Sequence, residues 1–244
     1  MQILIWILLS TFIISLISFI GVLFLALKEK VLQKILLVLV ALSAGALMGG
    51  AFLHLIPEAS EKINLSNTLL FVLVGFISFF FVEKVLHWRH CHKEKCAVHT
   101  FGYMNLFGDA IHNFIDGVII AASFVASIPL GIATSIAVTL HEIPQEIGDF
   151  GVLLYSGFKK SKAVFLNFVT ALTAIAGGLA GFFISENING ISSYLVSFAA
   201  GGFIYIAATD LIPEIRKELS LRKSMLYILI FALGIAIMYA FKSI

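Results

Sequence analysis

Two polar runs interrupt the apolar middle of this chain, His112-Asn113-Phe114-Ile115-Asp116-Gly117 and His141-Glu142-Ile143-Pro144-Gln145-Glu146. Both lie within Phe101–Gly157, in segments that are otherwise apolar enough to cross a membrane. An ionisable side chain at membrane depth costs about 2.5–3.5 kcal/mol on an insertion scale. Because at least five such side chains lie here, we expect a compensating role, and binding of a divalent cation is the first candidate.

The composition excludes an ordinary soluble domain. The 244 residues are 60% hydrophobic and only 12% charged, whereas soluble domains carry about 25% charged residues. We therefore predict a polytopic membrane protein with a single domain over residues 1–244. Residues 3–27 are too long for a signal-peptide core and lack a basic leader, so we expect them to form a retained first helix.

The predicted fold is an all-α polytopic membrane protein with eight transmembrane helices. Each predicted span is long enough for a bilayer core, which needs about 20 residues. The spans lie at roughly 3–27, 35–57, 66–86, 104–127, 130–157, 164–185, 191–213 and 225–241.

The basic residues orient these spans. Of the 16 basic residues, 14 follow the first, third, fifth or seventh span, and only Lys62 and Lys242 lie on the other side. Positively charged loops stay in the cytoplasm. We therefore expect a protein of the cell (inner) membrane with both termini outside the cytoplasm.

The second and seventh spans share a sequence pattern. Ala44-Gly45 and His54-Leu55-Ile56-Pro57-Glu58 match Ala200-Gly201 and Asp210-Leu211-Ile212-Pro213-Glu214 at a constant offset of 156. The two spans cross in opposite directions, which is typical of an inverted-repeat transporter. The pattern predicts that spans 1–3 and 6–8 form an inverted repeat around a hairpin of spans 4 and 5; chance similarity between two Gly/Ala-rich helices is the alternative.

The two polar runs are predicted to lie at one depth. The turn of the hairpin lies at Ile128-Pro129, and residues equally far from it along the two helices have equal depth. His112 is then level with Gln145, and Asp116 is level with His141. This depth is about 18–25 Å from the outer turn, at 1.5 Å per residue.

Helix periodicity then sorts the polar residues by face, because residues four apart share one side of a helix. The first predicted metal-binding group comprises His112, Asp116, His141 and Gln145. The second comprises Asn113 and Glu142, with Asn167 as a candidate from the sixth span.

Imidazole and carboxylate ligands suit zinc, iron and manganese. The absence of thiolates among these residues favours exchangeable binding over a closed structural site. Pro144 should kink its helix and leave the Leu140 carbonyl without a partner. A polar network that only joins helices is the alternative, but such bonds average below about 1 kcal/mol in membranes.

Further polar residues extend from this level toward the cytoplasm. Asp109 and Asp149 are level with each other, and with Asn105 and Glu146 they are candidates for an exit path. Ordinary helix-end carboxylates are the alternative. The predicted cytoplasmic loop at about 87–103 carries His87, His90, Cys91, His92, Cys96 and His99, a density that suggests transient metal capture.

These motifs resemble the ZIP (Zrt-, Irt-like protein) family of divalent metal transporters. The resemblance rests on H-N-F-x-D-G, on H-E-x-P-x-E-x-G-D, which is similar to the HEXPHE branch, and on A-A-G-G-F-I-Y followed by D-L-I-P-E. It implies a binuclear site with His112, Asp116, His141 and Gln145 at the primary position and Asn113, Glu142 and Asn167 at the second. It also implies a homodimer, uptake into the cytoplasm and elevator-like motion. The chain departs from many relatives at Gln145, where His or Glu is common.

The sequence therefore predicts a transporter of divalent transition-metal ions, with zinc first and iron, manganese and cadmium as further substrates. It predicts no enzyme activity, no catalytic cofactor and no nucleic-acid partner; the partners are the metal ions and the lipid bilayer. An intramembrane metal-dependent hydrolase is one alternative, because His141-Glu142 begins an H-E-x-x-H pattern, but Gln145 replaces its second His. A proton-coupled metal antiporter is the other.

Overall fold

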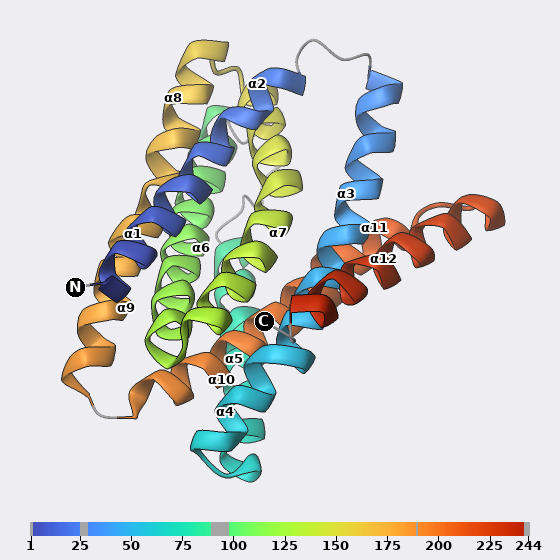
Figure 1. The fold of residues 1–244 in the computed structure, drawn as a ribbon. Helices are drawn as coiled ribbons and strands as arrows, with labels where there is room; N and C mark the ends of the chain where they lie inside the picture. The colour runs from blue at the N-terminus through green and yellow to red at the C-terminus, as the bar shows by residue number, and fades with distance from the viewer. Residues whose placement is uncertain (1, 25–28, 89–97, 189, 242–244) are drawn as a thin grey trace.

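A computed structural model describes residues 2–24, 29–88, 98–188 and 190–241, in which the regular elements are helices (Figure 1). The first half contains α1 (Gln2–Ser15), η1 (Leu16–Phe19), α2 (Ile20–Phe24), α3 (Glu29–Gly49), η2 (Gly50–Leu55), α4 (Ile56–Lys62), α5 (Leu65–Trp88) and α6 (Val98–Ala126). The second half contains α7 (Ile128–Tyr155), α8 (Lys160–Ala171), α9 (Thr173–Asn187), α10 (Ile191–Ile206), η3 (Ala207–Leu211), α11 (Ile212–Arg216) and α12 (Leu221–Phe241).

Seven helical stretches within the described residues are long and apolar enough to cross a membrane. They coincide with seven of the predicted spans, which confirms an all-helical polytopic membrane protein. The predicted fifth span is α7, a helix of 28 residues that is not among the seven. It carries the second polar run and Asp149, so it is less apolar than the others, and the total of eight spans stays a prediction.

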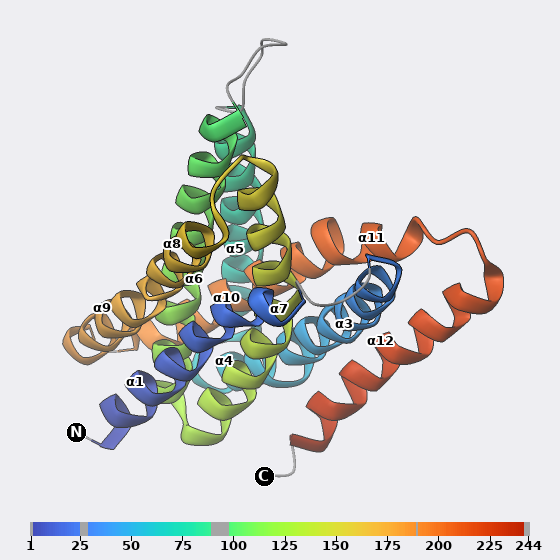
Figure 2. The same ribbon diagram turned by 90° about the horizontal axis from the view of Figure 1, so that it is seen from above.

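The helices pack as two bundles (Figures 1 and 2). Bundle 1 contains α1, α2, α6, α7, α8 and α9, with α6 lying along both α9 and α7. Bundle 2 contains α3, α4, α5, α10, α11 and α12, with α3 paired to α12 and α5 paired to α10. The bundles meet where α7 contacts α3 and where α6 contacts α10.

Glycines allow the closest helix pairs to form. A Cβ atom added at Gly117 of α6 would lie 1.9 Å from the Ala174 carbonyl oxygen of α9. In bundle 2, a Cβ at Gly45 of α3 would lie 2.0 Å from the Phe231 oxygen of α12. These backbones touch directly, because glycine has no side chain to keep them apart. Such close packing drives helix association in lipid, where there is no hydrophobic driving force between helices.

The segments that share a sequence pattern also share a local structure. In each, a long α-helix passes into a π-helical turn, η2 or η3, and then into a short helix that begins with Ile-Pro. Gly45 and Gly201, which correspond at the offset of 156, have corresponding surroundings. A Cβ at Gly201 would lie 2.0 Å from the Val72 oxygen of α5, as one at Gly45 would from α12.

The hairpin of α6 and α7 turns where the sequence predicts. Helix α6 ends at Ala126 and α7 begins at Ile128, with Pro129 in its first turn. The Ser127 hydroxyl oxygen accepts a hydrogen bond from the Leu130 amide at 3.3 Å and caps α7. The predicted loop at 87–103 overlaps α5 and α6 at its ends, and residues 89–97 lie outside the described residues.

Candidate metal centre

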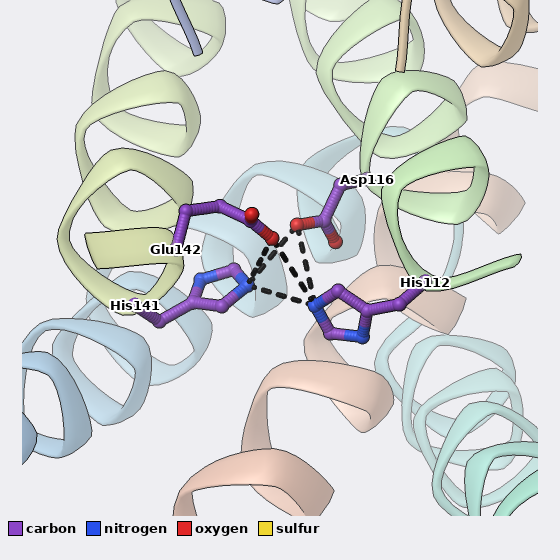
Figure 3. Close-up of side chains that lie close together, drawn as sticks. All are labelled: His112, Asp116, His141 and Glu142. Carbon is purple, nitrogen blue, oxygen red and sulfur yellow. Dashed lines mark hydrogen bonds and ion pairs between the residues drawn. The ribbon is translucent and has the colours of Figure 1, made fainter. Parts of the chain in front are cut away.

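Four side chains from the α6–α7 hairpin converge between the two helices (Figure 3). His112 and Asp116 lie one turn apart on α6, so their side chains share a face. His141 and Glu142 are neighbours on α7 at the same level. One ligand atom from each of the four lies within 4.8 Å of the others. We call these residues the four-residue cluster.

The distances within this cluster are short. Asp116 Oδ2 lies 3.0 Å from His141 Nε2 and 3.7 Å from His112 Nε2. Glu142 Oε1 lies 3.4 Å from His112 Nε2 and 3.6 Å from His141 Nε2. The two Nε2 atoms are 3.2 Å apart. A tetrahedral zinc ion with bonds of about 2.0–2.1 Å holds its ligand atoms about 3.3–3.4 Å apart, so the spacing fits such an ion.

The chemistry of the cluster also suits a cation. The nitrogen Nδ1 of His141 lies 3.2 Å from the Ala137 carbonyl oxygen, to which it donates when it carries the proton. Nε2 then presents a lone pair to the centre, which is the arrangement of a metal-binding imidazole. The side chains of Asp116, His141 and Glu142 are each only 1% exposed. Buried carboxylates facing imidazole lone pairs repel one another unless positive charge lies between them.

A cavity of about 670 Å³ leads away from the cluster toward the predicted cytoplasmic side. His112 and His141 line its inner end, and Asp149 and Glu214 line it farther out. The outward turns of α6 and α7 contain Ile119, Ile120, Ala137 and Val138, all buried in the main hydrophobic core. The cluster is therefore accessible from one end and sealed by apolar side chains at the other.

Gln145 lies beside this cluster rather than in it. Its Nε2 atom is 3.5 Å from Asp109 Oδ1. Asn113 also faces Asp109, because its Nδ2 atom donates to the same oxygen at 2.8 Å. The structure thus brings Glu142 together with His112, Asp116 and His141, and it places Gln145 and Asn113 around Asp109.

Asn167 faces Glu146 rather than the cluster. Its side-chain amide donates to Glu146 Oε2, and both side chains are fully buried. Glu146 Oε1 and Asn167 Oδ1 have no hydrogen-bond partner among the described residues. Asp149 accepts a hydrogen bond of 2.9 Å from Asn105 Nδ2 and lines the cavity, as does Asp109.

Three carboxylates of bundle 2 that were not predicted as site residues line the same cavity: Glu83, Asp210 and Glu214. The phenol of Tyr205 donates to Glu83 and so fixes it against α10. Asp210 and Glu214 are the first and last residues of the D-L-I-P-E run in the seventh span. That motif could have indicated these two residues as site candidates. Its position opposite α6, however, depends on how the two bundles pack.

The sequence is similar to a family of zinc transporters over most of its length. A family model described as ZIP Zinc transporter matches residues 2–100 and 88–242. The chain is similar to "Zinc transporter ZIP13" of Pongo abelii, with 34% identity over 221 residues and 84% of this chain. It is also similar to "Zinc transporter zipt-7.2" of Caenorhabditis elegans, with 32% identity over 84% of this chain. "Zinc transporter YKE4" of Saccharomyces cerevisiae is 34% identical over 72% of it.

These relatives are longer than the present chain. The matched regions span 66%, 58% and 60% of their own lengths, respectively. Their names describe transporters rather than enzymes, which does not favour the hydrolase alternative.

Proposed function

Because the chain belongs to the ZIP zinc transporter family, we propose that it carries divalent transition-metal ions across a membrane into the cytoplasm, with zinc as the first substrate. The observation that carries the proposal is the four-residue cluster at the closed end of a cavity that is lined with carboxylates. Iron, manganese and cadmium are further substrates, since imidazole and carboxylate ligands bind them too. The distribution of basic residues supports a cell (inner) membrane location with both termini outside.

We propose His112, Asp116, His141 and Glu142 as the ligands of the transported ion. Two imidazoles and two carboxylates replace the water that the ion loses on leaving solution. Asn113 and Asn167 remain candidates for a second ion, as the resemblance implies, and we add Gln145 to them because it faces Asp109. Their contacts with Asp109 and Glu146 support a position on the cytoplasmic side of the cluster.

Release then proceeds through the cavity. Asp109 and Asp149 line it on the side of bundle 1, and Asp210 and Glu214 line it on the side of bundle 2. These carboxylates attract the cation after it leaves the imidazoles, and water in the cavity restores its hydration shell.

Transport also requires a second conformation in which the cavity is closed to the cytoplasm. The paired π-helical turns and the matched surroundings of Gly45 and Gly201 support an inverted repeat, in which α3–α5 and α10–α12 form a frame. Bundle 1 moving against this frame is the elevator-like motion that we propose. A homodimer would place two such frames side by side.

Metal uptake into sealed proteoliposomes tests the proposal. Zinc, cadmium, iron and manganese are supplied outside, and a fluorescent chelator reports their arrival inside. Asp116→Ala should abolish uptake, whereas Glu186→Ala, which removes an exposed carboxylate at the end of α9, should leave it unchanged. Full uptake by Asp116→Ala would overturn the site assignment, and failure of the wild-type protein to take up any of the four metals would overturn the proposed function.

A further inference from the structure

Pro144 creates an unmet hydrogen-bonding need in the wall of the metal centre. It lies inside α7 and has no amide proton, so the carbonyl of Leu140 loses its usual helical partner. Leu140 directly precedes His141, one of the four cluster residues. A backbone carbonyl left unpaired at membrane depth costs several kcal/mol, so another donor is expected nearby.

Ser43 of α3 supplies that donor. Its hydroxyl donates to the Leu140 carbonyl oxygen across the interface between α3 and α7. The same hydroxyl lies 2.7 Å from the Leu39 oxygen one turn back in its own helix. That oxygen already accepts the Ser43 amide, as in any α-helix, so Leu140 is the carbonyl that depends on Ser43. The Ser43 side chain is only 1% exposed, and water does not compete for the bond.

The hydrogen bond from Ser43 to Leu140 differs from the other side-chain hydrogen bonds in the helices that it joins. Side-chain hydrogen bonds within bundle 1 include Thr173 to Ala110, at 2.7 Å, and those within bundle 2 include Tyr205 to Glu83. Of the side-chain hydrogen bonds between described residues, the bond from Ser43 to Leu140 is the one that joins the two bundles. The rings of His141 and Phe203 also meet between the bundles, with their centroids 6.2 Å apart.

We infer that Ser43 is a positioning residue for metal binding, acting through the Leu140 carbonyl on the adjoining residues His141 and Glu142. Holding that carbonyl fixes the height and rotation of α7 at the point where the proline has removed the helical constraint. Metal ligands must be held closely to bind well, so loss of the bond weakens binding although Ser43 touches no ligand atom. The inference rests on the proposed function, since it concerns the same centre.

A double-mutant cycle on the full chain in detergent tests this role, with zinc as the titrant in calorimetry. Ser43→Ala should weaken zinc binding about threefold to tenfold, the range expected from the loss of one bond between membrane helices. Ser43→Thr, which keeps the hydroxyl, should bind within about twofold of wild type. In Pro144→Ala the new amide can donate to the Leu140 carbonyl, so adding Ser43→Ala to it should change binding by less than about twofold.

Ser135→Ala is the matched control, because the Ser135 hydroxyl donates to Gly131 within α7 itself, at 2.7 Å. It should bind zinc as the wild type does. Equal zinc affinity in wild type and Ser43→Ala would overturn the inference while leaving the proposed function in place. So would an effect of Ser43→Ala that is the same with and without Pro144, or one that Ser135→Ala reproduces. Absence of zinc binding by the wild-type protein would instead overturn the proposed function, and this inference with it.

Discussion

Asp116 Oδ2 and His141 Nε2 lie 3.0 Å apart across the α6–α7 hairpin, although the two residues are 25 positions apart in sequence. Both side chains are 1% exposed. A carboxylate and an imidazole so close and so deeply buried are a strong pair of ligands for one ion.

The first prediction concerns the charge of Asp116. Asp116→Asn keeps the shape of the side chain but removes the negative charge that a cation needs. We expect zinc affinity to fall at least about a hundredfold, which is the upper end of the loss seen when only an outer partner of a metal ligand is removed. Calorimetric titration of the purified protein measures it. Glu186→Gln is the control, and an affinity within a few-fold of wild type in Asp116→Asn would contradict the ligand assignment.

The second prediction separates Glu142 from Gln145. Glu142 Oε1 lies within 3.6 Å of both imidazole Nε2 atoms, whereas Gln145 faces Asp109. Glu142→Gln should therefore weaken zinc binding at least about tenfold, and Gln145→Ala should weaken it less than about threefold. The same titration checks both variants. The reverse order of effects would place Gln145 in the primary site and Glu142 outside it.

The third prediction compares two glycines by stability. A Cβ at Gly117 would lie 1.9 Å from a backbone oxygen of α9, which cannot move aside alone. Gly117→Ala should destabilise the fold by about 1–3 kcal/mol, as overpacking does. A Cβ at Gly148 would meet nothing within 4 Å, so Gly148→Ala should unfold at the wild-type temperature or slightly above. Thermal unfolding in detergent compares the two, and equal losses of stability would argue against the close packing of α6 on α9.

The fourth prediction uses the open surroundings of Gly148 and Gly151. Both lie on α7, and Gly148 lines the cavity. A Cβ at either would meet no neighbour, unlike one at Gly45 or Gly117. We expect this face to be covered when the cytoplasmic end closes. Gly148→Leu should then leave zinc affinity within about twofold but reduce uptake at least about tenfold. Calorimetry and proteoliposome uptake on the same preparation check the two effects, and normal uptake would show that closure does not use this face.

Much of the site follows from sequence because membrane helices are regular. The i, i+4 spacing of His112 and Asp116 fixes their common face, and the short turn at Ser127 fixes the depth of His141 relative to them. Neither inference depends on how other helices pack. The π-helical turns were not predicted, although the Ile-Pro pairs that follow them are visible in the sequence.

The exact membership of the cluster could not be obtained in this way. Glu142 and Gln145 are three residues apart on α7, and both lie near the side of the helix that faces α6. A rotation of a few tens of degrees decides which of them reaches His112. That rotation depends on Pro144 and on the contact of Leu140 with Ser43, which lies 97 residues earlier in the chain. The contribution of Glu83 to the cavity depends likewise on how the bundles pack.

The make-up of the four-residue cluster has an electrical consequence. With neutral imidazoles, its two carboxylates carry a charge of about −2, which one divalent ion cancels. A transmembrane potential acts on net charge, at about 2.3 kcal/mol per elementary charge per 100 mV. The loaded cluster would therefore move without electrical work, whereas the membrane voltage would act on the negative charge of the empty one on its return. A monovalent ion would leave half of that charge uncompensated in the hydrocarbon region, so the balance of charge alone discriminates against sodium and potassium.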